Sequence, residues 1–132
     1  MKKNRQMVNP HAHSDSSLDG ACTVESYIKN AKELDLSYLA LTEHGNMNSA
    51  MNLYSSAKKA GIKPIFGCEM YMCEDMNIKT RMTFPHSPRQ TNPHITVIAH
   101  NNKGYKNLLK LYSLSYEKGF YYKPRIDEET LW

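Results

Sequence analysis

The sequence predicts an α/β domain with a mainly parallel sheet. Short apolar runs rich in β-branched and aromatic residues alternate with amphipathic segments of helical spacing. This alternation is typical of βα units, and its order here is βα, βα, β, loop, βα. The 132 residues, 40% of them hydrophobic and 23% charged, suffice for one soluble domain with a modest core.

The first half of the chain is expected to contain two strands and the helix between them. Residues 6–13 form the first expected strand, with Pro10 at an edge or near the strand's end because proline cannot donate to a ladder. Thr23 is the expected N-cap of a helix that runs to about residue 34. The near-continuous apolar run 38–42 is typical of a strand buried on both faces of a parallel sheet.

A second helix is expected over 46–60, and a third strand over 63–72 with an interruption at Gly67. The polar, proline-containing stretch 74–93 is long for a loop, and such loops tend to carry function or to move. Dense β-branching predicts a fourth strand at 94–99.

The last part of the chain is expected to hold a third helix over about 104–118 and another short one that starts at 127–129. The third helix also carries basic and aromatic side chains, namely Lys106, Lys110, Tyr112 and Tyr116. We interpret them as a solvated face beside a core face in preference to a nucleic-acid patch.

The charge and the cysteine content indicate which partners and which cellular compartment to expect. The net charge of +4 and the pI near 8.9 are compatible with an anionic partner, although many cytosolic proteins match them. Three cysteines without a CxxC pair imply no disulfide framework, and they favour a reducing compartment. No segment approaches the roughly 18 apolar residues of a membrane span, so a cytoplasmic protein is expected.

Metal-competent side chains follow three successive strands. His11 and His13 end the first strand, and the period-two alternation of an extended segment puts both imidazoles on one side. Glu43 and His44 end the second strand, and Glu69 follows the apolar part of the third. Because sites in α/β folds gather at the carboxyl ends of strands, these side chains are expected to converge.

His94 opens its strand instead of closing it, which is the wrong end for a simple parallel barrel. It would lie beside Glu69 if the chain doubles back after residues 70–73. A mixed histidine and carboxylate set favours Zn²⁺, Mn²⁺ or Fe²⁺ over Mg²⁺ and Ca²⁺. Neighbouring ions in such a set suit the hydrolysis of a phosphate ester.

Each of these residues taken alone has an ordinary structural explanation, and only their joint placement favours a metal site. Asp19 before Gly20 is typical of a turn, and His86 and His100 are interpreted as structural or solvated residues. The phosphate-loop, dinucleotide-binding, GxSxG and CxxC patterns are absent from the sequence.

Matching motifs run in order over nearly the whole chain, at residues 11–14, 17–20, 41–46, 61–69, 94–99, 104–108 and 119–127. They resemble the PHP (polymerase and histidinol phosphatase) domain, in the form found at the N-terminus of bacterial replicative DNA polymerase III alpha subunits. The GIKPI-x-G-x-E and KPRID segments are specific to that polymerase form. The resemblance implies the first part of a distorted TIM-like (β/α)₇ barrel with a multinuclear metal cluster at its mouth.

The resemblance also implies a set of metal ligands: His11, His13, Asp19, His44, Glu69 and His94. Family members with intact sites resemble metal-dependent phosphoesterases, and in some polymerases the domain acts as a 3′–5′ exonuclease. In others it is a scaffold. The implied partners are DNA, the remainder of the alpha subunit and other replisome subunits, with no membrane.

Three features depart from the family pattern. Glu43 replaces the aspartate of the usual Thr-Asp-His-Gly motif, where its extra methylene could shift a hydrogen bond that supports a ligand. The loop before Asp19 is one residue shorter than usual, which leaves Asp15 as an alternative ligand. The family's last three ligands would lie downstream of residue 132, so residues 1–132 are expected to be the N-terminal portion of a truncated PHP domain, without a polymerase domain.

Three functions therefore stay open. The first is the PHP portion of a polymerase alpha subunit with an exonuclease-like phosphoesterase site, weakly active or inactive as an isolated chain. The second is a stand-alone phosphatase acting on a small phosphomonoester. The third is a non-catalytic replisome scaffold.

Overall fold

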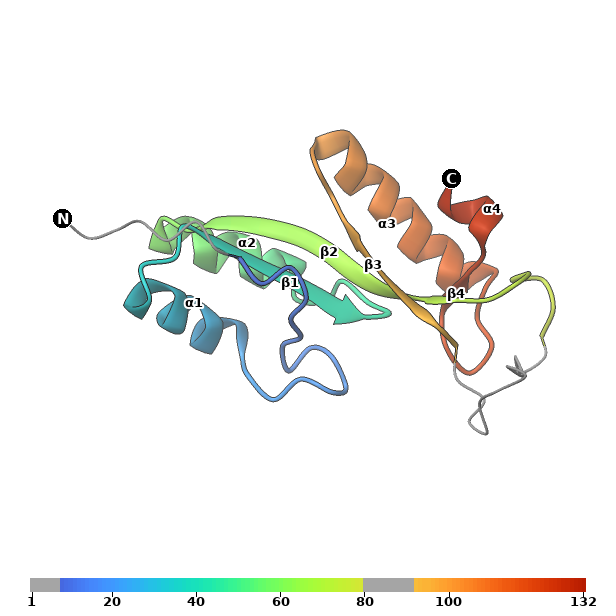
Figure 1. Cartoon of the computed structure of the whole chain (residues 1–132), viewed down its shortest axis with the longest axis horizontal. Helices are drawn as coiled ribbons and strands as arrows, with labels where there is room; N and C mark the ends of the chain where they lie inside the picture. Colours follow the sequence, from blue (N-terminus) through green and yellow to red (C-terminus); the bar gives the residue numbers. More distant parts are fainter. Residues whose placement is uncertain (1–7, 80–91) are drawn as a thin grey trace.

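The computed structural model describes residues 8–79 and 92–132. Its elements are, in order, α1 (Val24–Glu33), β1 (Tyr38–His44), α2 (Ala50–Ala60), β2 (Lys63–Met72), β3 (His94–Ile98), α3 (Asn102–Glu117), β4 (Arg125–Ile126) and α4 (Glu128–Leu131). The expected α/β class is confirmed (Figure 1). Within these residues, no helix has the length and apolar character needed to cross a membrane.

The long strand β2 is the centre of a mixed four-stranded sheet. It pairs in parallel with β1 along one edge and with β4 near its end, whereas β3 runs antiparallel to it. The expected parallel arrangement is thus correct for two of the three strand pairs. The exception is β3, because the chain turns back after β2 in the way that the position of His94 required.

The expected strand at 6–13 is wrong for the described residues 8–13, which have no strand conformation. The backbone N–H of Thr42 donates to the Ala12 carbonyl at 2.9 Å. In the other direction, however, the Ala12 N–H is bonded to the Thr42 hydroxyl at 3.3 Å. A side chain thus takes the place of a backbone partner, and Pro10 has no N–H to extend a ladder. Residues 6 and 7 lie outside the described part.

The expected interruption of β2 at Gly67 is also wrong, because the strand is continuous there. A Cβ at Gly67 would lie 2.7 Å from the Thr42 methyl group and 2.7 Å from the Val97 carbonyl oxygen. Glycine at this position therefore allows the neighbouring strands to pack closely, and it does not break the strand.

Two helix starts differ from the expected ones by a few residues. α2 begins at Ala50 and not at Asn46, because the Asn46 side chain accepts a hydrogen bond from the Asn48 N–H at 3.0 Å and forms a turn. α3 begins at Asn102, ahead of the expected residue 104, because the Asn101 side chain caps it by accepting from the Gly104 N–H at 3.0 Å.

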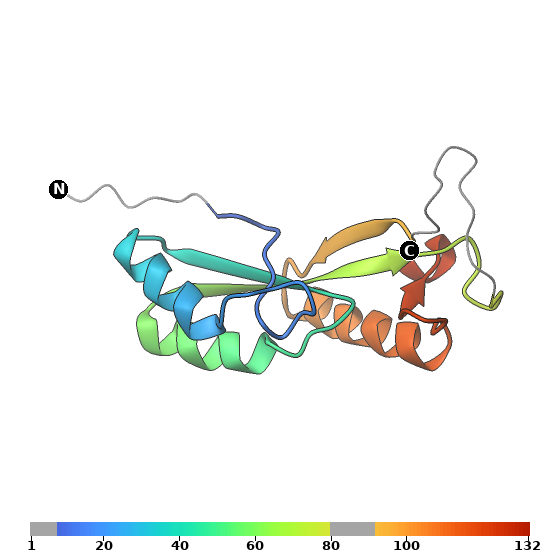
Figure 2. The ribbon, with the colours of Figure 1, turned by 90° about the horizontal axis from the view of Figure 1, so that it is seen from below.

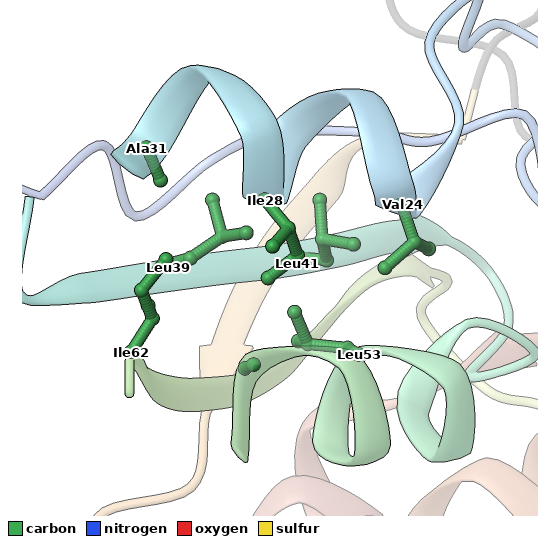
Figure 3. Packing of buried hydrophobic residues seen from close by; sticks show 8 residues of the cluster. Val24, Ile28, Ala31, Leu39, Leu41, Leu53 and Ile62 are labelled. Atoms are coloured by element: carbon green, nitrogen blue, oxygen red, sulfur yellow. The ribbon is translucent and has the colours of Figure 1, made fainter. Parts of the chain in front are cut away.

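One face of the sheet carries the core. The first cluster joins α1 and α2 to β1 (Figure 3) and consists of Val24, Ile28, Ala31, Leu39, Leu41, Leu53, Ala57 and Ile62. The second lies under α3 and consists of Cys68, Met70, Leu108, Leu111 and Ile126. Figure 2 shows the three long helices along the same side of the sheet.

Strand register decides what the opposite face carries. His44 pairs with Glu69 across β1 and β2, and Tyr71 pairs with His94 across β2 and β3. Side chains alternate between faces along a strand, so all four point away from the face that holds Leu41 and the other core residues. A slip of one residue would turn the whole set into the core.

The KPRID segment ties the C-terminal part together. Arg125 is 1% exposed, and its guanidinium donates to the carbonyls of Gly119 at 2.9 Å and Ile78 at 3.1 Å. Asp127 caps α4 by accepting from the Thr130 N–H at 2.9 Å, and its other oxygen accepts from the Met76 N–H at 3.1 Å. The short helix expected at 127–129 is therefore present, directly after this cap.

We expect the Asp127 carboxylate to make stability depend on pH. Burial raises its pKa, but hydrogen bonds from the Thr130 hydroxyl and from the Met76 and Thr130 N–H groups outweigh burial and lower the pKa below its usual value. The stabilisation is thus complete above the unfolded pKa of about 4 and is lost as pH falls through the lower folded value. Asp127→Asn should cost about 1 kcal/mol at neutral pH, because an amide group would face the Met76 N–H.

Urea unfolding of both proteins at neutral and acidic pH would measure this difference. It should shrink as pH falls below about 4. A difference independent of pH would show that the charge of Asp127 contributes nothing.

Candidate metal centre

Glu69 lies at the centre of a group of histidines on the open face of the sheet. Its Oε2 atom is 2.6 Å from His11 Nε2 and 2.7 Å from His13 Nε2, although both histidines come from the segment before α1. The Glu69 carboxylate is nearly buried, with 8% of its side chain exposed, whereas half of the His11 side chain is exposed. The two rings of the His-x-His pair thus reach the same carboxylate oxygen, as alternation along an extended segment predicts.

Asp19 bridges two further histidines. Its Oδ1 atom lies 2.9 Å from His13 Nδ1, and its Oδ2 atom lies 2.9 Å from His44 Nδ1. The Ser17 hydroxyl donates to Oδ1 at 2.7 Å and fixes the carboxylate within the short loop. Asp15, the alternative ligand, makes none of the described carboxylate–histidine contacts.

His94 closes the group from the antiparallel strand. Its Nδ1 lies 3.2 Å from Glu69 Oε1, and its Nε2 lies 3.3 Å from His44 Nε2. The expectation that His94 lies beside Glu69 is therefore confirmed, and the reason is the reversal of the chain between β2 and β3. The structure brings all six residues implied by the resemblance into one contiguous group.

The six residues form three overlapping triads: His11, His13 and Glu69; His13, Asp19 and His44; and His44, Glu69 and His94. Within each triad, the potential ligand atoms lie within 4.8 Å of one another. Ligands roughly 2.0–2.1 Å from a tetrahedral zinc ion lie about 3.3 Å apart, which is the spacing of the two Nε2 atoms of His44 and His94. Because each triad shares residues with the next, the arrangement suits neighbouring ions.

The environment of one buried nitrogen atom, His13 Nε2, indicates whether this group of residues suits a metal ion. His13 Nε2 is buried and, among the described residues, has no hydrogen-bond partner, although Glu69 Oε2 lies only 2.7 Å away. Buried polar atoms nearly always have a partner, so an unpartnered imidazole nitrogen beside a carboxylate fits a cation between them. Histidine nitrogen with carboxylate oxygen is also the donor set of Zn²⁺, Mn²⁺ and Fe²⁺ sites.

The pKa shifts of Asp19, Glu69 and His94 favour the forms of these three side chains that bind metal. The hydrogen bond with His44 is the largest influence on Asp19 and lowers its pKa well below the usual value. Burial raises the pKa of Glu69, but the hydrogen bond with His11 and the neighbouring imidazoles outweigh it, so the net pKa is lowered. Burial and the charge of His44 lower the pKa of His94, which favours its neutral ring. Charged carboxylates and neutral imidazoles are the forms that bind metal.

Glu43 supports the group without touching its histidines in the described structure. The carboxylate is buried and accepts from both the N–H of Ser14, at 3.0 Å, and its hydroxyl, at 2.5 Å. Ser14 directly follows His13, whose own carbonyl accepts from the Tyr27 hydroxyl at 3.0 Å. Glu43 thus holds the segment that carries the histidine pair.

Sequence reasoning missed Tyr71. Its ring stacks on His44, with centroids 4.6 Å apart and an interplanar angle of 18°, and meets His94 edge-on at 4.8 Å. The signal was its position two residues after Glu69, which puts both side chains on the same face of β2.

Other candidates lie outside the group. His100 is exposed and belongs to none of the triads, and His86 lies outside the described residues. Burial raises the pKa of the Cys68 thiol to about 12, and it raises the pKa of Cys73 as well. Both cysteines are therefore buried apolar side chains, as expected.

The mixed sheet covered by helices on one face, with histidines and carboxylates gathered on its open face, defines an α/β domain with a candidate metal site. The chain belongs to the PHP domain family, whose family model matches residues 9–132.

The curated relatives are named DNA polymerase III subunit alpha. The protein of this name from Borreliella burgdorferi is 45% identical over 127 residues, which cover 96% of this chain and 11% of the relative. Those from Helicobacter pylori strain 26695 and Aquifex aeolicus are 40% and 39% identical, and cover 99% and 96% of this chain but only 10% and 11% of the relatives. The chain thus spans about a tenth of the length of these proteins.

Solved structures show the same fold at low identity. A protein described as a metal-dependent phosphoesterase from Bifidobacterium adolescentis matches with a TM-score of 0.57 and 15% identity, over 83% of this chain and 33% of that one. An amidohydrolase from Chromobacterium violaceum matches with a TM-score of 0.52 and 21% identity, over 81% and 34% of the two chains. The α/β fold is therefore that of part of a PHP-type, TIM-like barrel.

The two aspartates of the short loop offer a matched test of the site. We expect Asp19→Asn to weaken zinc binding about tenfold or more, because the amide cannot serve both imidazoles as a carboxylate does. Asp15→Asn, four residues earlier in the same loop, should change affinity less than about twofold. Competition with a chromophoric chelator measures both values, and equal effects of the two substitutions would place Asp19 outside the centre.

Proposed function

We propose that residues 1–132 form the N-terminal portion of a PHP domain in a DNA polymerase III alpha subunit, and that its metal centre hydrolyses phosphodiester bonds. The observation that carries this proposal is the set of three overlapping triads, two of which contain Glu69. Support for the polymerase setting comes from relatives that carry this name and match nearly the whole chain.

In this proposal the six residues are ligands and not proton-transfer groups. Divalent zinc, manganese or iron, when bound, supplies activated water near neutral pH and stabilises the leaving oxygen. His11 and His13 offer imidazole nitrogens from one side, and His44 and His94 offer them from the other. The carboxylates of Glu69 and Asp19 lie between these two pairs and contact both. Glu43, through Ser14, keeps the first pair in position.

The proposed substrate is the 3′ end of a DNA strand, and the proposed partners are the remainder of the alpha subunit and other replisome subunits in the cytoplasm. The KPRID segment favours this form over a stand-alone phosphatase, because the segment is specific to the polymerase form that the sequence resembles. A scaffold that binds no metal is less compatible with the buried His13 Nε2, which has no hydrogen-bond partner among the residues that the structure describes.

A comparison of two substrates tests the proposal. The 132-residue chain, supplied with Mn²⁺ or Zn²⁺, should slowly shorten a 5′-labelled oligonucleotide from its 3′ end and leave p-nitrophenyl phosphate nearly untouched. The variant with His11→Ala and His13→Ala should lose this cleavage, because the first triad would keep only its carboxylate. Denaturing gel electrophoresis follows the oligonucleotide, and absorbance follows the monoester.

Thermal unfolding with and without metal provides a second readout for a weakly active chain. Metal should raise the unfolding midpoint of the parent protein more than that of the double variant, which keeps only the triad of His44, Glu69 and His94. A ligand that binds only the folded state stabilises it. Faster hydrolysis of the monoester would favour the phosphatase. No cleavage of either substrate, with no stabilisation by metal, would favour the scaffold.

A further inference from the structure

The C-terminal half of α3 and Phe120, three residues after its end, carry a row of aromatic rings on the protein surface. The rings of Tyr112 and Tyr116 lie 5.1 Å apart, and those of Tyr116 and Phe120 lie 6.0 Å apart. Tyr116 is 43% exposed and Phe120 is 49% exposed. The four-residue spacing puts these rings along one side of the helix, and a cluster of exposed aromatic rings is uncommon unless it contacts a partner.

This row borders the metal centre. The Tyr116 hydroxyl donates to the carbonyl of Gly45 at 3.1 Å, and Gly45 directly follows the ligand His44. On the other side of that strand end, the Lys123 ammonium lies 5.3 Å from the centre of the Tyr71 ring, which itself stacks on His44. The row of rings thus reaches the residue after His44 from the helix side of the sheet, and a cation lies against the ring that stacks on His44.

The charge around the row is mainly positive. Lys118 and Lys123 are exposed beside Phe120, and the Lys79 ammonium is held against the carbonyl of Lys118. Glu117 is the acidic residue on the same turn. Exposed rings with lysines beside them are the combination by which proteins bind single-stranded nucleic acid, since bases stack on the rings and phosphates contact the cations.

We propose that Tyr112, Tyr116, Phe120 and Lys123 form a binding track for single-stranded DNA that directs a strand end toward the metal centre. This inference rests on the proposed function and deepens it by naming the surface that holds the substrate. Bases stack on the rings of Tyr116 and Phe120, and Lys123 contacts a phosphate next to His44. The stacking is independent of base identity, because every base has an aromatic face.

Binding of a 5′-fluorescein-labelled dT12 oligonucleotide, followed by anisotropy in the presence of EDTA, separates this inference from hydrolysis. Phe120→Ala should weaken binding about fivefold or more through the loss of a stacking surface. Lys123→Ala should weaken binding and lower the slope of log Kd against log salt by about 0.7, the value for one phosphate contact on a single strand.

Tyr54→Ala is the matched control. Tyr54 is 46% exposed on α2, and the Lys58 ammonium lies 5.6 Å from its ring centre, so the pair has the same chemistry away from the track. Its substitution should change binding less than about twofold. Thermal unfolding of each variant verifies that the fold is intact, and Phe120→Leu replaces Phe120→Ala if the latter is unstable.

Equal losses in Tyr54→Ala and the track variants would overturn the inference, as would unchanged binding in the track variants or no binding of dT12 by the parent chain. Tighter binding of a blunt duplex or of oligo(rU) than of dT12 would also overturn it. Binding that depends on the track without any hydrolysis would retain the inference and count against the proposed function. Hydrolysis that does not depend on the track would overturn the inference and support the proposed function.

Discussion

The contacts of the Glu69 carboxylate are the feature on which the rest of the site depends. One oxygen meets His11 and His13, and the other meets His94, so a single side chain joins three parts of the chain. A nearly buried carboxylate destabilises the folded protein unless a positive charge or hydrogen bonds compensate for its lost hydration. Its place at the end of β2 is set in turn by the register of that strand with β1 and β3.

For some of the candidate ligands, the positions follow from local rules that the sequence shows. Alternation along strands put Glu69 and His44 on one face, and the rule of strand carboxyl ends gathered them at one edge. His94 was the hardest to place, since only a reversal of the chain brings an opening residue to that edge. For Asp19, the family resemblance and not the local pattern suggested a ligand, and the bridge to His13 and His44 came only with the structure.

The errors arose where tertiary contacts override local pattern. The extended segment before Asp19 forms no strand ladder, because the Ala12 N–H donates to the Thr42 side chain and not to a backbone carbonyl. Residue propensities cannot predict such a long-range contact. Gly67 looked like an interruption, yet the approach of two neighbouring strands requires it. Tyr71 escaped notice for the same reason, since periodicity identifies a face but not what lies against it. Tyr112 and Tyr116 were interpreted as part of a solvated face, and the contact between their rings came only with the structure.

The first measurement to make is the metal content of the chain purified without chelator. Comparing the parent protein with Glu69→Gln and Glu74→Gln tests whether a metal centre is built around Glu69. Glu69 belongs to two of the three triads, whereas Glu74 is an exposed carboxylate five residues further along the same segment. We expect bound zinc, manganese or iron in the parent protein and in Glu74→Gln, with most of it lost in Glu69→Gln. Equal metal content in all three proteins, or none above background in the parent, would contradict a metal centre built around Glu69.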